Sequence, residues 1–110
     1  MNFILESSYD EEHKRWNAVI SGEVDIFESD AMKNTLLQLV LDKQGDLFID
    51  CRGLEYIDST ALGALVAVNR NVAAAGYSVH LLNIRPNLAK LFKITNLDHV
   101  FILEGDINEK

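Results

Sequence analysis

The residues best suited to chemistry in this sequence are three that follow one another, Asp58, Ser59 and Thr60. Asp and Ser are good helix-capping residues, because a side-chain oxygen accepts a hydrogen bond from an unpaired amide of the first turn. The positive end of the helix dipole also favours negative charge at such a point, including that of a phosphate. If a helix begins here, its first turn places the carboxylate of Asp58 beside the hydroxyl group of Ser59.

The residues on either side predict a strand, a turn and a helix. Upstream, residues 47–51 form a short, apolar, β-prone run that is typical of a buried strand. Downstream, residues 61–75 contain no proline and repeat apolar side chains at helical spacing. Either Asp58 or Ser59 is then a candidate N-cap for the long helix.

The N-terminal part of the chain predicts a hairpin and a first helix. Strands around residues 3–5 and 16–20 are expected to pair, with an acidic tip between them in solvent. In the second strand, Trp16, Ala18 and Ile20 alternate with Asn17, Val19 and Ser21. Residues 22–25 are expected to form a loop that ends the second strand. Ser29 or Asp30 is then expected to cap a helix.

The C-terminal part continues the alternation of strands and helices. Gly76 is expected to end the long helix, and residues 78–82 to return as a strand. Pro86 suits the first turn of a third helix, since it lacks an amide that would be unpaired there. A last strand at residues 100–103 precedes a short acidic tail. This order predicts an α/β fold with a small mixed, mostly parallel β-sheet of about five strands and helices packed against it.

Length, composition and charge limit the architecture and the partners. A chain of 110 residues with 48% hydrophobic residues has room for one domain, 1–110, whose core is expected at about residues 16–103. No apolar run approaches the ~20 residues that span a bilayer, and acidic residues interrupt the N-terminus early, unlike a signal peptide. The net charge of −7 argues against nucleic acid binding. The single cysteine, Cys51, excludes an internal disulfide, so we expect a cytoplasmic protein without membrane insertion.

The long helix is expected to have one apolar face and one face of small side chains. At about 100° per residue, the apolar face consists of Ala61, Leu62, Leu65, Val66, Val68 and Val72. The opposite face consists of Thr60, Gly63, Ala64, Ala67, Asn71 and Ala74. Small side chains let another backbone approach closely, which indicates a docking surface. A solvent-exposed helix face explains the same pattern, because glycine there costs only ~1 kcal/mol relative to alanine.

The sequence lacks the patterns of catalytic and metal sites. His13, His80 and His99 are scattered without metal-ligand spacing. Ser59 lies outside any G-x-S-x-G motif, and no Walker or G-x-G-x-x-G loop is present. Cys51 is predicted to be a small buried hydrophobe. We therefore expect a protein that is not an enzyme and has no cofactor or metal. The enzymatic alternative is a small enzyme that uses Ser59 or Cys51 as nucleophile.

Three segments in chain order resemble the STAS domain of bacterial anti-sigma factor antagonists. They are residues 22–25 (Gly-Glu-Val-Asp), 54–63 (Leu-Glu-Tyr-Ile-Asp-Ser-Thr-Ala-Leu-Gly) and 88–97 (Leu-Ala-Lys-Leu-Phe-Lys-Ile-Thr-Asn-Leu). Order and spacing match from about Trp16 to Leu103, and the Asp-Ser-Thr element followed by Leu-Gly is the more specific signal. The residue before Leu62 is commonly glycine in the family, whereas it is Ala61 here.

The resemblance implies partner switching. In this family the serine after the aspartate is phosphorylated by the anti-sigma factor, which is itself a serine kinase, and that role falls on Ser59. The unphosphorylated form would bind this kinase, which has a histidine-kinase-like ATPase fold, and free its sigma factor; a phosphatase would reset the switch. The expected partner contacts are Asp25, Asp58, Thr60, Gly63, Ala64 and Ala67.

Two further expectations concern assembly. A monomer is favoured for the free protein. The alternative function is a STAS module that never switches, as a structural subunit of a larger signalling or lipid-transport assembly. In that alternative Ser59 is only a helix cap.

Overall fold

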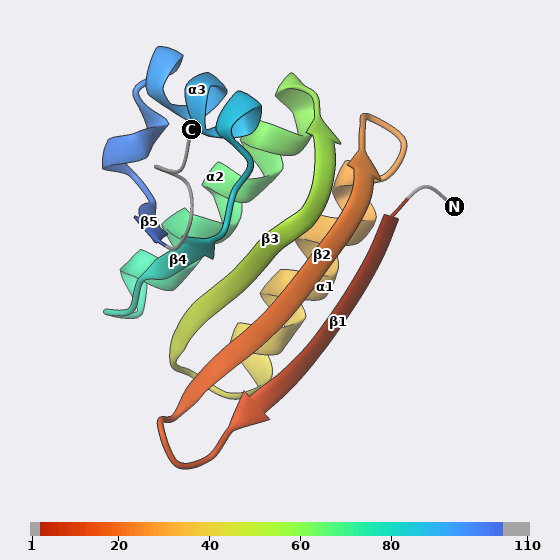
Figure 1. Cartoon of the computed structure of the whole chain (residues 1–110). Helices are drawn as coiled ribbons and strands as arrows, with labels where there is room; N and C mark the ends of the chain where they lie inside the picture. The colour runs from red at the N-terminus through yellow and green to blue at the C-terminus, as the bar shows by residue number, and fades with distance from the viewer. Residues whose placement is uncertain (1–2, 105–110) are drawn as a thin grey trace.

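The computed structural model describes residues 3–104, which form a five-stranded sheet with three α-helices against it (Figure 1). In chain order the elements are β1 (Phe3–Asp10), β2 (Arg15–Val24), α1 (Ser29–Asp42), β3 (Asp46–Ile57), α2 (Ser59–Ala74), β4 (Val79–Leu82), α3 (Pro86–Ile94), the 3-10 helix η1 (Leu97–His99) and β5 (Ile102–Glu104). The predicted α/β class is confirmed.

The strands lie in the sheet in the order in which they occur in the chain. β1 and β2 pair antiparallel as the predicted hairpin, whereas β2, β3, β4 and β5 pair with their neighbours in parallel. Parallel neighbours need a crossover connection, and α1 and α2 supply the first two of these behind the sheet in the view of Figure 1. As a result, β2 and β3 both end, and α1 and α2 both begin, at the upper end of the molecule.

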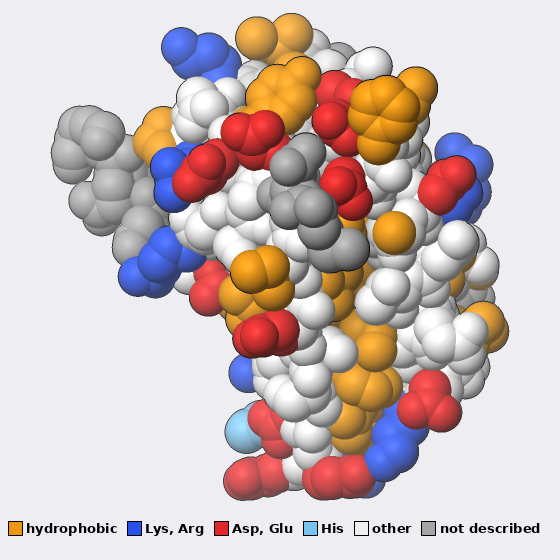
Figure 2. All heavy atoms as spheres, turned by 90° about the vertical axis from the view of Figure 1, so that its right-hand side faces the viewer, with side chains coloured by type: hydrophobic (Ala, Val, Ile, Leu, Met, Phe, Trp, Pro, Cys, Tyr) orange, Lys and Arg blue, Asp and Glu red, His pale blue; other side chains and the backbone are white. Residues whose placement is uncertain are grey.

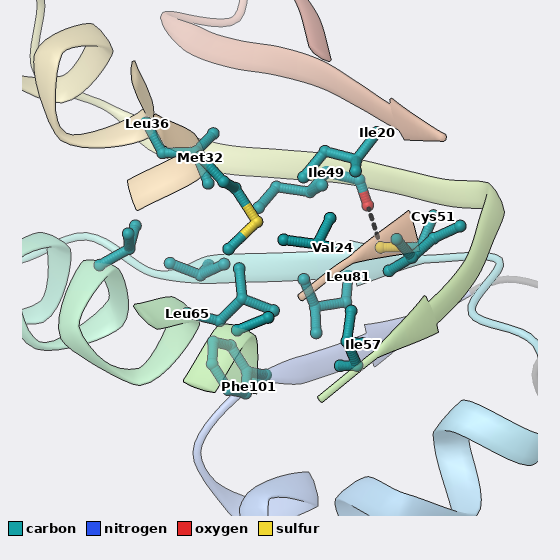
Figure 3. Packing of buried hydrophobic residues seen from close by; sticks show 14 of the residues in the cluster. Ile20, Val24, Met32, Leu36, Ile49, Cys51, Ile57, Leu65, Leu81 and Phe101 are labelled. Carbon is teal, nitrogen blue, oxygen red and sulfur yellow. Dashed lines mark hydrogen bonds between the residues drawn. The ribbon is translucent and has the colours of Figure 1, made fainter. Parts of the chain in front are cut away.

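The core lies between the sheet and the helices (Figure 3). Trp16, Ala18 and Ile20 point inward on β2 with the predicted alternation. The buried side chains labelled in Figure 3 are Ile20, Val24, Met32, Leu36, Ile49, Cys51, Ile57, Leu65, Leu81 and Phe101. Phe3 of β1 is also buried, so packing extends to the N-terminal side of the core start expected near residue 16.

Three local expectations for the first half of the chain were wrong. Gly22 and Glu23 belong to β2 and not to a loop, because Gly22 adopts a left-handed φ of 95° at a register shift and the strand continues to Val24. The strand expected at residues 47–51 is also longer than predicted, because β3 runs through Gly53 to Ile57. Neither Ser29 nor Asp30 caps α1, whose N-cap residue is Glu28 and makes no side-chain cap hydrogen bond.

Within residues 3–104, no helix is long and apolar enough to cross a membrane. The expected acidic tail after residue 104 lies outside the described residues.

Candidate functional site

The turn after β2 and the turn after β3 lie side by side. Val24 and Ile57 are register partners in the parallel β2–β3 pair. The next amide, that of Asp58, donates a hydrogen bond to the carbonyl oxygen of Val24 at 3.3 Å. Asp25 and Asp58 are therefore the first residues after two adjacent strands, at the same edge of the sheet (Figure 1).

Asp58 caps α2. Its backbone is extended, its Oδ1 accepts a hydrogen bond from the amide of Ala61 at 2.9 Å, and its carbonyl accepts one from the amide of Leu62 at 3.0 Å. Ser59 is consequently the first helical residue, and its side chain is exposed. Of the two residues predicted as possible caps, Asp58 is the N-cap residue, and the hydroxyl of Ser59 has no capping role.

Asp25 shapes the neighbouring turn. Its Oδ1 accepts a hydrogen bond from the amide of Phe27 at 2.9 Å, and its carbonyl accepts bonds from the amides of Glu28 and Ser29 at 3.0 and 2.9 Å. This pattern is an Asx-turn that leads into α1, and the carbonyl of Asp25 pairs with the amide of Ser29, the first helical residue. The turn-forming role of Asp25 was not predicted from the sequence.

The small-residue face of α2 is open in part. Thr60 and Gly63 are exposed, and a Cβ built on Gly63 meets no atom within 4 Å. Ala67 is half-buried. The placement of Ala64 on this open face was wrong, because its side chain is only 8% exposed. Ala64 lies three residues after Ala61 and four before Val68, and so belongs to the same buried stripe.

The model of the STAS domain family matches residues 18–109. The chain belongs to the STAS domain family. Over 81 residues this STAS domain is 33% identical to the anti-sigma-B factor antagonist of Bacillus subtilis (strain 168), which covers 74% of this chain and 73% of that protein. A recognisable relative of this STAS domain is therefore an antagonist of an anti-sigma factor.

Solved structures show the same fold. An anti-sigma factor antagonist from Mycobacterium paratuberculosis superposes with a TM-score of 0.73 at 22% identity, over 92% of this chain and 86% of that one. The Bacillus cell fate determinant SpoIIAA in its phosphorylated form gives a TM-score of 0.71 at 16% identity, over 91% and 90% of the two chains. The STAS architecture predicted from the sequence is confirmed.

The Cys51 thiol and the His80 imidazole are engaged in packing and hydrogen bonds. Burial, and secondarily the charge of Asp50, raises the pKa of the Cys51 thiol to about 12, as suits the predicted buried hydrophobe. His80 stacks on Phe48 and has ring nitrogens 3.0 Å from the hydroxyl of Ser78 and 2.8 Å from a carboxylate oxygen of Glu104. Among residues 3–104, no group of three or more His, Cys, Asp or Glu could hold a metal ion.

Two hydrophobic side chains in the turn before α1 were not singled out by the sequence. Ile26 is 60% exposed and Phe27 is 86% exposed. They lie between Asp25 and Glu28, and Figure 2 shows hydrophobic side chains next to acidic ones at this upper end of the molecule. The available signal was a pair of large apolar residues after the strand alternation had ended at Val24.

Proposed function

We propose that this STAS domain is an anti-sigma factor antagonist that binds an anti-sigma serine kinase in its unphosphorylated form, thereby freeing the sigma factor. Phosphorylation of Ser59 by that kinase switches it off, and a phosphatase restores it. The relationship to the anti-sigma-B factor antagonist of Bacillus subtilis supports the class of partner. In this proposal the domain has no catalytic activity, needs no cofactor, and acts in the cytoplasm as a monomer.

The observation that carries the proposal is the position of Ser59. Its side chain is exposed at the first position of α2, and Asp58 has already taken the capping role. The N-cap position, where a serine side chain would act as a cap, is occupied by Asp58. Capping therefore does not account for Ser59, which supports the switching proposal over the alternative in which this serine is only a cap.

A phosphate on Ser59 is compatible with the fold. It would lie at the positive end of the α2 dipole, beside amides of the first turn that have no partner within the helix. A helix N-terminus accommodates an added phosphate, which brings about −1.5 to −2 charges at neutral pH. The phosphorylated protein is accordingly expected to remain folded without a large conformational change.

The same phosphate would oppose docking. Asp58 precedes it directly, and Asp25 follows the adjacent strand, so the modification places a dianion in a turn region that is already acidic. Burying that charge under a partner adds like-charge repulsion and desolvation. A penalty of several kcal/mol is expected, and each ~1.4 kcal/mol is a tenfold loss of affinity.

The proposed contact surface centres on Ser59. Asp25, Asp58, Thr60 and Gly63 surround it, and the half-buried Ala67 extends it by one turn of α2. Gly63 leaves open space above the helix, where a partner backbone can approach closely. Ala64 lies beneath this surface and supports it by packing.

The experiment is phosphorylation by a purified kinase. Each histidine-kinase-fold serine kinase encoded in the source genome is incubated with this protein and ATP, and the intact mass is measured. One kinase is expected to add a single phosphoryl group to the wild type and none to Ser59→Ala. If every kinase leaves the wild type unmodified, the switch is refuted and the non-switching module is favoured.

A further inference from the structure

Phe27 is the most exposed large hydrophobic side chain in the part of the chain that the structure describes. Phe27 immediately precedes Glu28, the N-cap residue of α1, and a hydrophobic residue at that position commonly packs on the fourth helical residue. Here the fourth residue, Met32, is fully buried, yet Phe27 is 86% exposed. Phe27 therefore does not pack there, and together with Ile26 it presents apolar surface to solvent.

The turn that carries these side chains is fixed. The amide of Phe27 is held by Oδ1 of Asp25, and the amides of Glu28 and Ser29 are held by the Asp25 carbonyl. These hydrogen bonds hold the backbone of the turn, and with it the Cα–Cβ directions of Ile26 and Phe27, before any partner arrives. An exposed aromatic group on a pre-organised turn loses little conformational entropy on binding, which is the property of an interface anchor.

This turn is continuous with the Ser59 surface and shares its charge. The hydrogen bond from Asp58 to Val24 joins the two turns directly. Residues 16–32 and 53–69 contain six carboxylates and no lysine or arginine; the six are Glu23, Asp25, Glu28, Asp30, Glu55 and Asp58. Asp30 is paired with the next basic residue, Lys33, at 4.0 Å. A partner that covers Ile26 and Phe27 therefore contacts acidic residues around them, and its own surface at these contacts must be basic.

We infer that Ile26 and Phe27 are the apolar anchor by which the anti-sigma serine kinase docks, and that they help to decide which kinase this protein serves. This inference rests on the proposed function. A kinase that acts on Ser59 must bring the phosphates of ATP to the start of α2, and a protein surface that neutralises those phosphates is basic. Such a surface is complementary to the acidic turns, and an apolar pocket on its margin would receive Phe27.

A second copy of this chain is the less suitable occupant. A symmetric dimer through Ile26 and Phe27 would bring the same acidic turn of each copy together, in a protein of net charge −7. Like charges directly opposed across an interface cost affinity. The charge pattern thus selects a partner of opposite sign over the chain itself.

The test compares Phe27→Ser and Ile26→Ser with Leu41→Ser in binding to the kinase that modifies Ser59. Leu41 is 76% exposed in the last turn of α1, about 20 Å along the helix from the anchor, and serves as the matched control. Titration calorimetry on the unphosphorylated protein is expected to show binding weakened at least about tenfold by Phe27→Ser, less by Ile26→Ser, and hardly by Leu41→Ser. All three variants should unfold cooperatively, since the replaced side chains are exposed.

The outcomes separate this inference from the proposed function. If the kinase phosphorylates the wild type but binds Phe27→Ser as tightly, the anchor is refuted and the switch stands. If the wild type is neither bound nor phosphorylated, the proposed function itself has failed. Sedimentation that shows a wild-type dimer dispersed by Phe27→Ser would assign the patch to a second copy and overturn the inference.

Discussion

The backbone amide of Asp58 donates a hydrogen bond to the carbonyl oxygen of Val24, with 3.3 Å between the two atoms. This bond belongs to the last registered pair of the parallel β2–β3 ladder, Val24 and Ile57. It fixes the start of α2 against the turn that begins α1. One partner can therefore contact Ser59 and the Asp25 turn at the same time.

Replacing Ser59 should separate the effect of charge from that of the hydroxyl. Ser59→Asp adds a negative charge at the proposed contact and is expected to weaken kinase binding at least about tenfold, whereas Ser59→Ala should bind like the wild type. Surface plasmon resonance with the immobilised kinase measures both. Equal affinity of the two variants would mean that charge at this position does not block docking. Thr35→Ala, which removes an exposed hydroxyl of α1 outside the proposed contact surface, is the control.

Asp58 should stabilise the fold through its cap. Asp58→Ala removes the acceptor for the amide of Ala61 and is expected to lower the free energy of unfolding by ~1 kcal/mol. Asp58→Asn keeps an oxygen at that place and should lose much less. Urea denaturation followed by circular dichroism measures the difference. Similar losses in both variants would show that the charge, and not the hydrogen bond, is the stabilising feature.

Gly63 offers a probe of the surface that leaves the fold intact. A Cβ at this exposed helical position meets nothing within 4 Å, so Gly63→Ala should raise the free energy of unfolding by ~1 kcal/mol. Gly63→Arg should also fold, but its long side chain would prevent close approach and abolish kinase binding. Thermal unfolding and the same binding assay measure the two effects. Undiminished binding by Gly63→Arg would exclude this face from the interface.

Gly53 should be needed for the close passage of β3 past β2. A Cβ on Gly53 would lie 2.7 Å from the Cβ of Ser21, so Gly53→Ala is expected to destabilise the fold by about 1–3 kcal/mol. Ser21→Gly removes the opposing atom, and the double variant should recover part of the loss. A double-mutant cycle in urea measures this coupling. Additive losses would show that the two positions do not compete for space.

The buried Cys51 thiol should make stability depend on alkaline pH. Its pKa is raised from 9.0 to about 12 in the folded protein, so between these values the unfolded chain loses a proton that the folded chain keeps. Stability should therefore fall as pH rises above about 9, by up to ~1.4 kcal/mol per pH unit, and be unaffected by this thiol below it. The measurement is the difference in unfolding free energy between wild type and Cys51→Ala across about pH 8–11, where the pKa shift of the thiol should change stability. A constant difference would contradict the raised pKa, as would rapid modification of the native thiol by Ellman's reagent.

Local patterns in the sequence predicted most elements of the fold. The alternation of Trp16, Ala18 and Ile20, the helical repeat after Ser59 and Pro86 at the start of α3 depend on interactions over a few residues, and the structure confirms these elements. The Asp-Ser-Thr motif also marked the start of α2 correctly. Periodicity and capping are local properties, so they can be read along the chain.

The tertiary structure decided what depends on neighbours distant in sequence. Val24 and Ile57 become partners only through the parallel β2–β3 pairing, which places Asp25 beside Asp58. Ala64 was assigned to the small-residue face of the helix but is buried. Burial depends on how much of α2 the rest of the fold covers, which the helical periodicity does not give. Phe27 is exposed for the corresponding reason: an apolar residue is buried only where the fold brings other atoms to it, and nothing in a residue's type states whether that happens.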